Sequence, residues 1–109
     1  MNYSIVRLIK EFRTGNRNAF EEIYNRHHLQ LYYFARKLTG NPEVAAEIVS
    51  DTFVRLWTLR AGFTTLERIK SFLYLTARNA CLDYLRTDQS TFEQNIIEAE
   101  LLYAHSNNQ

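Results

Sequence analysis

The sequence predicts an all-α domain: a compact bundle of about four helices, followed by a C-terminal linker segment that has helical spacing of its own. Only three Gly and one Pro occur in 109 residues, which is little punctuation for a many-stranded β fold. Apolar residues make up 46% of the chain and aromatic residues 14%, enough for one hydrophobic core and unlike a disordered chain. These apolar residues recur with the period of an α-helix.

Capping residues and glycines bound the first two predicted helices. Ser4 is a suitable N-cap for a short amphipathic helix that stops at Gly15. Asn18, with Glu21 three residues later, has the spacing of a capping box. We therefore expect a second, longer helix from Asn18 until Gly40.

The third helix has the clearest start, because Asn41-Pro42-Glu43 supplies a cap, a proline in the first turn and an acid near the positive helix end. It is expected to run from Pro42 to about Arg60. Residues 61–66 break the helical period and contain Gly62, which indicates a loop. A fourth helix should follow from about Glu67 to Arg86, with an inward stripe formed by Leu73, Ala77, Ala80, Cys81 and Tyr84.

Charge divides the chain into a predicted domain, residues 1–86, and an acidic linker segment, residues 87–109. All thirteen Lys and Arg lie in the domain, whereas the linker segment carries four of the twelve acids. Ser90 and Glu93 form a second capping box, so a fifth helix is expected to about Ala104. It either extends into solvent or folds back over the apolar side chains of Phe72, Leu75 and Leu82.

The residues give no support to an enzyme, a metal site or a membrane protein. There is no Gly-rich phosphate loop, catalytic triad pattern or Cys/His zinc spacing, so we expect no cofactor. His27 and His28 point about 100° apart on a helix, too far to bind one metal ion easily. We expect one of the two rings to pack against the protein and the other to face solvent. Cys81 is expected to be an inert buried thiol. A single Cys and charge-free stretches of only about half a bilayer span indicate a cytoplasmic protein.

The third helix has two different faces when its residues are placed at 100° intervals. The core face is predicted to hold Ala45, Val49, Thr52, Phe53 and Leu56. The opposite face, with Trp57 at its edge, holds Glu47, Ser50, Asp51 and Val54. Because two acids four residues apart repel one another beside an exposed valine, this face suits a basic partner helix. An ordinary solvated face fits the same pattern.

The outward side of the fourth helix mixes aromatic, aliphatic, amide and charged groups: Phe72, Leu75, Asn79, Leu82, Asp83 and Arg86. Arg78 flanks this side, and Arg68 and Lys70 stand at the start of the helix. Such a surface suits single-stranded nucleic acid, where rings stack on bases and cations contact phosphates. The other interpretation is that the apolar members pack under the first helix or the fifth.

Three segments carry a family resemblance: Ala19–Tyr24 (AFEEIY), Asn41–Trp57 (NPEVAAEIVSDTFVRLW) and Ser71–Arg86 (SFLYLTARNACLDYLR). In this order and spacing they closely resemble region 2 of the extracytoplasmic-function sigma factors, over roughly Ser4 to Arg86. The resemblance implies an all-helical domain of a bacterial transcription initiation factor. Such a domain binds core RNA polymerase and recognises and melts the minus-ten element of promoter DNA.

For polymerase binding, the resemblance implies contacts from the third helix to the clamp coiled coil of the β′ subunit, through Glu47, Ser50, Asp51, Val54 and Trp57. The chain departs from the family at Ser50, where Gln is usual. For DNA, it implies a pocket for a base flipped out of the non-template strand, formed by the loop from Gly62 to Ile69 with Thr76 and Asn79. The implied DNA-binding residues are Gly62, Phe63, Arg68, Lys70, Phe72, Thr76, Arg78, Asn79 and Arg86.

The same resemblance implies partners and a further domain. Residues 87–109 would lead to a C-terminal helix-turn-helix domain, and an anti-sigma factor would cover the binding faces. The competing hypothesis is a helical adaptor that binds protein only. The loop around Gly62 distinguishes the two hypotheses, since an adaptor has no need of a base pocket beside Asn79.

Overall fold

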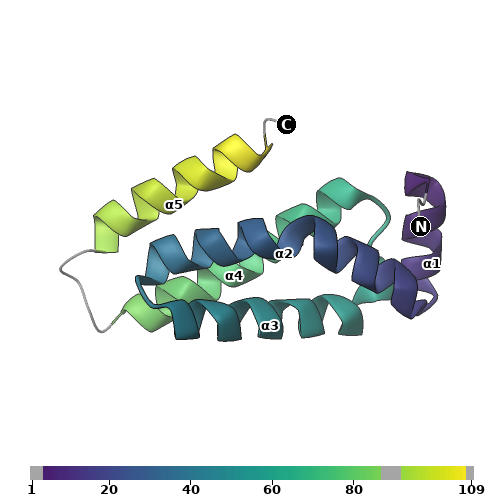
Figure 1. The fold of residues 1–109 in the computed structure, drawn as a ribbon, viewed down its shortest axis with the longest axis horizontal. Coiled ribbons are helices and arrows are strands. Elements are labelled where there is room, and N and C mark those ends of the chain that lie inside the picture. The colour runs from purple at the N-terminus through teal and green to yellow at the C-terminus, as the bar shows by residue number, and fades with distance from the viewer. Residues whose placement is uncertain (1–3, 87–91, 108–109) are drawn as a thin grey trace.

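The computed structural model describes residues 4–86 and 92–107, and every regular element in these ranges is a helix, which confirms the all-α prediction. Figure 1 shows α2, α3 and α4 lying lengthwise beside one another, with α1 across one end of the bundle and α5 along α2. In chain order the elements are α1 (Ile5–Arg13), α2 (Arg17–Thr39), α3 (Pro42–Thr58), the 3₁₀ turn η1 (Arg60–Gly62), α4 (Leu66–Leu85) and α5 (Phe92–Asn107).

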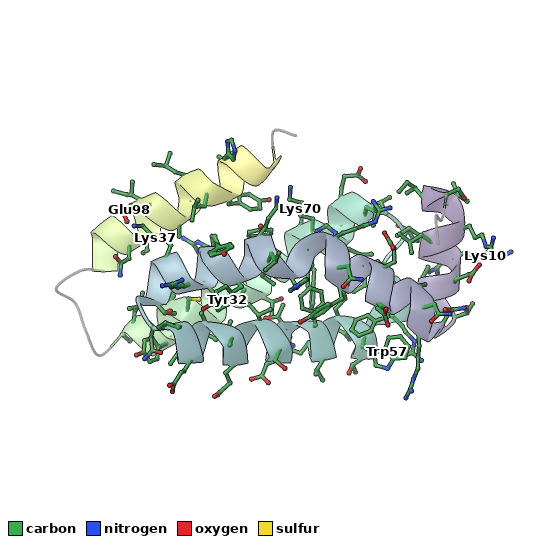
Figure 2. All side chains as sticks on the ribbon, viewed as in Figure 1. Lys10, Tyr32, Lys37, Trp57, Lys70 and Glu98 are labelled. Atoms are coloured by element: carbon green, nitrogen blue, oxygen red, sulfur yellow. The ribbon has the colours of Figure 1, made fainter. Side chains whose placement is uncertain are left out.

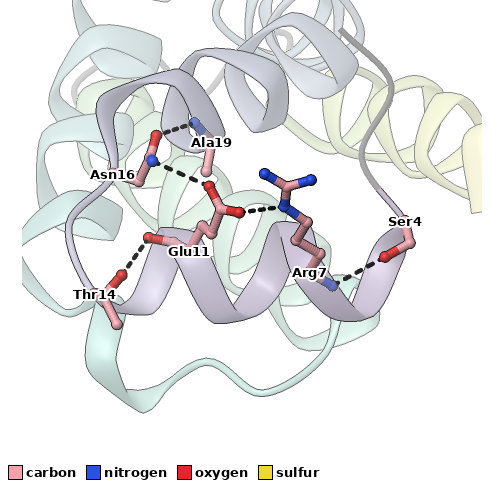
Figure 3. Close-up of polar contacts among 6 residues, drawn as sticks. All are labelled: Ser4, Arg7, Glu11, Thr14, Asn16 and Ala19. Atoms are coloured by element: carbon pink, nitrogen blue, oxygen red, sulfur yellow. Dashed lines mark hydrogen bonds and ion pairs between the residues drawn. The ribbon is translucent and has the colours of Figure 1, made fainter.

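The junction between α1 and α2 is held by polar contacts that local spacing did not identify (Figure 3). Ser4 caps α1 as predicted, with its Oγ accepting from the Arg7 amide at 3.3 Å. The cap of α2 is Asn16, however, whose Oδ1 accepts from the Ala19 amide at 3.0 Å. The prediction of Asn18 was wrong because the Asn16 side chain also donates to Glu11 of α1 at 3.1 Å, so one amide stabilises both helices.

The start of α3 is confirmed, since Asn41 Oδ1 accepts from the amides of Glu43 at 3.0 Å and Val44 at 3.2 Å. The helix ends at Thr58, earlier than predicted, and the chain tightens into η1. The fourth helix begins one residue before the predicted Glu67, with Thr65 Oγ1 accepting from the Arg68 amide at 3.1 Å.

The core surrounds α2, which packs against α1, α3, α4 and α5. All five predicted core residues of α3 are buried, as are Leu73, Ala77 and Cys81 of α4. Tyr84 was wrongly assigned to the inward stripe: its side chain is 43% exposed, and its hydroxyl accepts from Asn41 Nδ2 at 3.4 Å. Leu85 is buried in its place, because α4 packs against both α2 and α3 and so buries a broader stripe.

The acidic helix α5 folds back on the bundle. Ala99 is fully buried, the Tyr103 ring lies 4.7 Å from the Tyr74 ring, and Asn95 donates to the Leu38 carbonyl at 3.1 Å. Of the three apolar residues predicted beneath it, Leu75 shares a pocket with Glu100 and Tyr103 of α5 yet stays 60% exposed. The Phe72 ring packs on Phe63, and Leu82 is half-buried against the core. The predicted capping residue Ser90 lies outside the described residues. Separately, no helix in the described part of the chain is long and apolar enough to cross a membrane.

His27 of α2 lies partly buried, with its Nε2 atom enclosed and without a hydrogen-bond partner among the described residues. Burial, followed by the positive charges of Lys70 and Arg26, lowers the pKa of this imidazole to about 4 from its ordinary 6.5. The ring is therefore neutral in the folded protein at neutral pH. His28 is half-buried as well, against the expectation that one histidine of the pair faces solvent.

This pKa predicts that stability falls with acidification. Between about pH 6.5 and about pH 4 the unfolded chain binds a proton at His27 that the folded chain does not, so the free energy of unfolding should drop by up to about 1.4 kcal/mol per pH unit. Urea unfolding of the wild type and His27→Gln at several pH values measures this term. Parallel pH profiles for the two proteins would contradict the assignment.

Candidate functional site

An open groove of about 450 Å³ runs between α2 and α3. Three of the residues predicted on the outward face of α3 line it, namely Ser50, Val54 and Trp57. Val54 is 61% exposed, so the groove presents apolar area to solvent. The structure thus joins part of the predicted surface to a concave site.

Five of the eleven residues that line this groove come from α2 and were not predicted from the sequence: Phe20, Tyr24, His28, Leu29 and Tyr32. The His28 ring stacks on Tyr24 with centroids 4.4 Å apart and planes within 8°, and Leu29 is 57% exposed. Figure 2 shows Tyr32 and Trp57 at separate positions between α2 and α3. The available signal was the recurrence of ring side chains every four residues along α2, at Phe20, Tyr24, His28 and Tyr32.

The acids Glu47 and Asp51 lie beside the groove on α3. Both are exposed, and within the described residues neither forms an ion pair. They are neighbours of the groove wall, because Glu47 lies three residues before Ser50 and Asp51 three residues before Val54, and residues three apart are adjacent on a helix surface. The groove therefore combines an apolar floor with a negatively charged border, which complements a partner helix carrying apolar and basic side chains.

A second cavity, of about 480 Å³, opens at the loop between α3 and α4. Its walls are Gly62, Phe63, Thr65, Glu67, Arg68 and Ser71. The predicted loop thus does form a concave site. Thr76 and Asn79 do not line it, since Asn79 lies eight residues beyond Ser71 on α4, about 12 Å along the helix axis. The structure therefore separates the two parts of the predicted base pocket.

The remaining predicted DNA contacts differ in what surrounds them. Phe72 is half-buried and packs edge-on against Phe63, with ring centroids 5.0 Å apart. Arg78 is paired with Glu100 of α5, Nη2 to Oε1 3.1 Å, and Arg86 is paired with Asp83 at 3.2 Å. Lys70 lies near enough to His27 to lower its pKa. Arg78 is thus engaged by the acidic segment.

Cys81 has the environment expected of an inert thiol. Its side chain is fully buried, Sγ lies 4.0 Å from the Ala35 carbonyl oxygen, and burial raises the pKa of the thiol to about 12. It is therefore protonated at neutral pH and shielded from solvent. Within the described residues no group of three or more His, Cys, Asp or Glu side chains is arranged to hold a metal ion.

Comparison with known protein families now assigns the chain. Residues 23–91 match the family model described as Sigma-70 region 2, and the chain belongs to this family. The match begins in α2 and includes α3, the loop cavity and α4. The resemblance noted in the sequence is confirmed.

Curated relatives carry the names of extracytoplasmic-function (ECF) sigma factors. The ECF RNA polymerase sigma factor SigM of Mycobacterium tuberculosis is 33% identical over 66% of this chain and 37% of its own length. The ECF RNA polymerase sigma factor SigW of Bacillus subtilis is 26% identical over 79% and 46%, and the RNA polymerase sigma factor CarQ of Myxococcus xanthus is 28% identical over 72% and 45%. The chain thus spans less than half the length of these relatives. No solved structure matches it.

Proposed function

We propose that this chain is the domain of a bacterial transcription initiation factor that binds core RNA polymerase and then recognises and melts the promoter minus-ten element. The observation that carries the proposal is the open aromatic groove between α2 and α3, bordered by acids that form no ion pair within the described residues. It lies on the helix for which the family resemblance implies polymerase binding. The action would take place in the cytoplasm, where polymerase and promoter are found.

Docking on polymerase would use both halves of the groove. An apolar ridge of a partner helix would rest on Val54, Trp57 and Leu29, while basic residues of that helix would meet Glu47 and Asp51. The clamp coiled coil of the β′ subunit is the proposed partner. Burial of the groove would supply affinity, and the charge pairs would supply orientation and association rate.

Promoter recognition would use the loop cavity. A base flipped out of the non-template strand loses stacking and pairing worth a few kcal/mol, which a preformed cavity offsets. Inside it, the Glu67 carboxylate is a suitable acceptor for an exocyclic amino group, and Arg68 is a suitable phosphate contact. This cavity favours a DNA-binding domain over an adaptor that binds protein only, because an adaptor has no use for it.

The proposal includes the rest of the protein's partners. We assign residues 87–109 to the linker that leads to a C-terminal helix-turn-helix domain, in keeping with relatives of which the matched segments make up 37% and 46%. An anti-sigma factor that covers the groove or the loop would inhibit both steps.

Docking can be tested at Asp51. Asp51→Arg places a positive charge against a basic partner helix and should cost on the order of 2 kcal/mol of polymerase binding or more, with the fold intact. Asp83→Arg, the same change on α4 and away from the groove, is the matched control. The measurement is the affinity of each folded variant for core polymerase. Wild-type affinity for Asp51→Arg would refute the docking surface.

Strand recognition can be tested at three positions of α4. Because Glu67 and Asn79 are about three helical turns apart on α4, Glu67→Ala and Asn79→Ala should each lose about 1 to 3 kcal/mol of base discrimination, at different promoter positions. Arg68→Ala should weaken binding to every sequence and reduce the salt slope by about 0.7. The measurement is oligonucleotide binding by polymerase carrying each variant. Loss of discrimination at the same promoter position in both variants would contradict the separation of Asn79 from the loop cavity.

The ion pair between Arg78 and Glu100 predicts that α5 weakens DNA binding. Glu100→Gln should free Arg78 for a phosphate, raising affinity for a single-stranded oligothymidylate and steepening the salt slope by about 0.7. Glu98→Gln is a matched control: it removes the same charge from α5 but releases Lys37, which is outside the proposed DNA face. Figure 2 shows this second pair between α5 and α2. Equal effects of the two variants would mean that only net charge matters.

A further inference from the structure

Arg60 lies between the docking groove and the loop cavity: its side chain contacts Trp57, a wall residue of the groove, and its backbone carbonyl bonds to Phe63, a wall residue of the cavity. Its guanidinium carbon lies 4.2 Å from the centroid of the Trp57 ring, and its Nη1 donates to the Trp57 carbonyl at 2.9 Å. Trp57 in turn lines the groove and contacts Phe20, with ring centroids 5.0 Å apart. A single residue therefore touches the tryptophan of the groove by both a cation–π contact and a hydrogen bond.

The same residue begins the loop. Arg60 is the first residue of η1, and its carbonyl accepts from the Phe63 amide at 3.3 Å. Phe63 is a wall of the loop cavity and packs on Phe72 of α4. A short chain of contacts thus runs from the groove, through Trp57 and Arg60, to the cavity.

The Arg60 side chain is held in place from the side of α1 as well. Gly15, at φ +93°, is close enough that a Cβ there would lie 3.4 Å from both Nε and Nη2 of Arg60. The Nε atom is buried and has no hydrogen-bond partner in the described part of the chain. Arg13 of α1 fixes the next peptide, donating from Nε to the Ala61 carbonyl at 3.1 Å.

A buried donor without a partner, such as Arg60 Nε, is unfavourable. The contacts of the guanidinium with the ring and the carbonyl of Trp57 offset this cost. The flat face of the Arg60 guanidinium stacks on the Trp57 indole, and its Nη1 donates to the Trp57 carbonyl. The plane of the guanidinium fits beside Gly15. A lysine keeps the charge but has neither the plane nor the fork of donors. The contact therefore depends on geometry more than on charge.

We propose that Arg60 is a positioning residue that sets the geometry of the loop cavity from the docking groove. The inference rests on the proposed function, because it requires polymerase at the groove and a base in the cavity. A partner helix pressed against Trp57 fixes the indole, the indole fixes Arg60, and Arg60 holds η1 and Phe63 in the arrangement that accepts the base. Arg60 itself contacts neither partner in this scheme.

The test is Arg60→Lys in the 109-residue chain, with two affinities measured separately. The first is for core RNA polymerase, and we expect it to stay within about twofold of wild type. The second is the affinity of the resulting complex for a labelled non-template minus-ten oligonucleotide, which should fall at least about fivefold, the lower end of typical coupling between sites. Core polymerase alone supplies the background. Arg36→Lys, an exposed position on α2, is the matched control and should change neither affinity.

A direct signal accompanies these measurements, since Trp57 is the single tryptophan of the chain. Loss of the stacked guanidinium in free Arg60→Lys should alter the indole emission, while helical circular dichroism stays unchanged. If Arg60→Lys loses both affinities equally, Arg60 has a structural role only and the proposal is overturned. The proposal is also overturned if the Arg60→Lys complex binds the oligonucleotide as tightly as the wild-type complex. Failure of the wild-type complex to bind the oligonucleotide would refute the proposed DNA function itself, and this inference with it.

Discussion

The arrangement of this domain depends on the burial of α2, which packs against every other α-helix of the described chain. At the end near α1, the Phe20 ring lies 6.1 Å from Phe12, 6.3 Å from Phe53 and 5.0 Å from Trp57. Aromatic contacts of this kind bury large areas and fix relative orientation. Beyond this cluster, α2 and α3 continue side by side, and no third helix among residues 4–86 and 92–107 covers Tyr24 and the residues that follow it in the groove. The groove is thus the uncovered continuation of the core.

Charge is distributed in two ways on this scaffold. On α3 the acids Glu47 and Asp51 remain without an ion pair within the described residues, and they are available to an external partner. On α5 the acids Glu98 and Glu100 are used internally, against Lys37 at 2.6 Å and Arg78 at 3.1 Å. Exposed pairs of this type add little stability and are weakened by salt. Their larger effect is on which basic groups remain free to meet a polyanion.

Local patterns predicted features that depend on a few neighbouring residues. The cap at Ser4 and the cap and proline at the start of α3 are such features, because an N-cap bonds to an amide two or three positions away. The helical period likewise identified the core face of α3, which packs against α2 and α4. Local reasoning failed at Asn16, where the hydrogen bond that decides the cap reaches back to Glu11 in the preceding helix. It failed at Tyr84 because two helices pack on α4, and a single-stripe pattern does not anticipate this.

The sequence by itself determined the helical class, the family resemblance and most helix boundaries, since these follow from composition, periodicity and short-range capping. Tertiary structure alone decided which surfaces became sites. Tyr24 and Val54 are thirty residues apart and share a groove only because α2 and α3 lie side by side. Asn79 was separated from the loop cavity by the rise of α4, and Arg78 was joined to Glu100 by the return of α5. Contacts between distant residues depend on how helices pack, and helical periodicity gives the faces of a helix but not their neighbours.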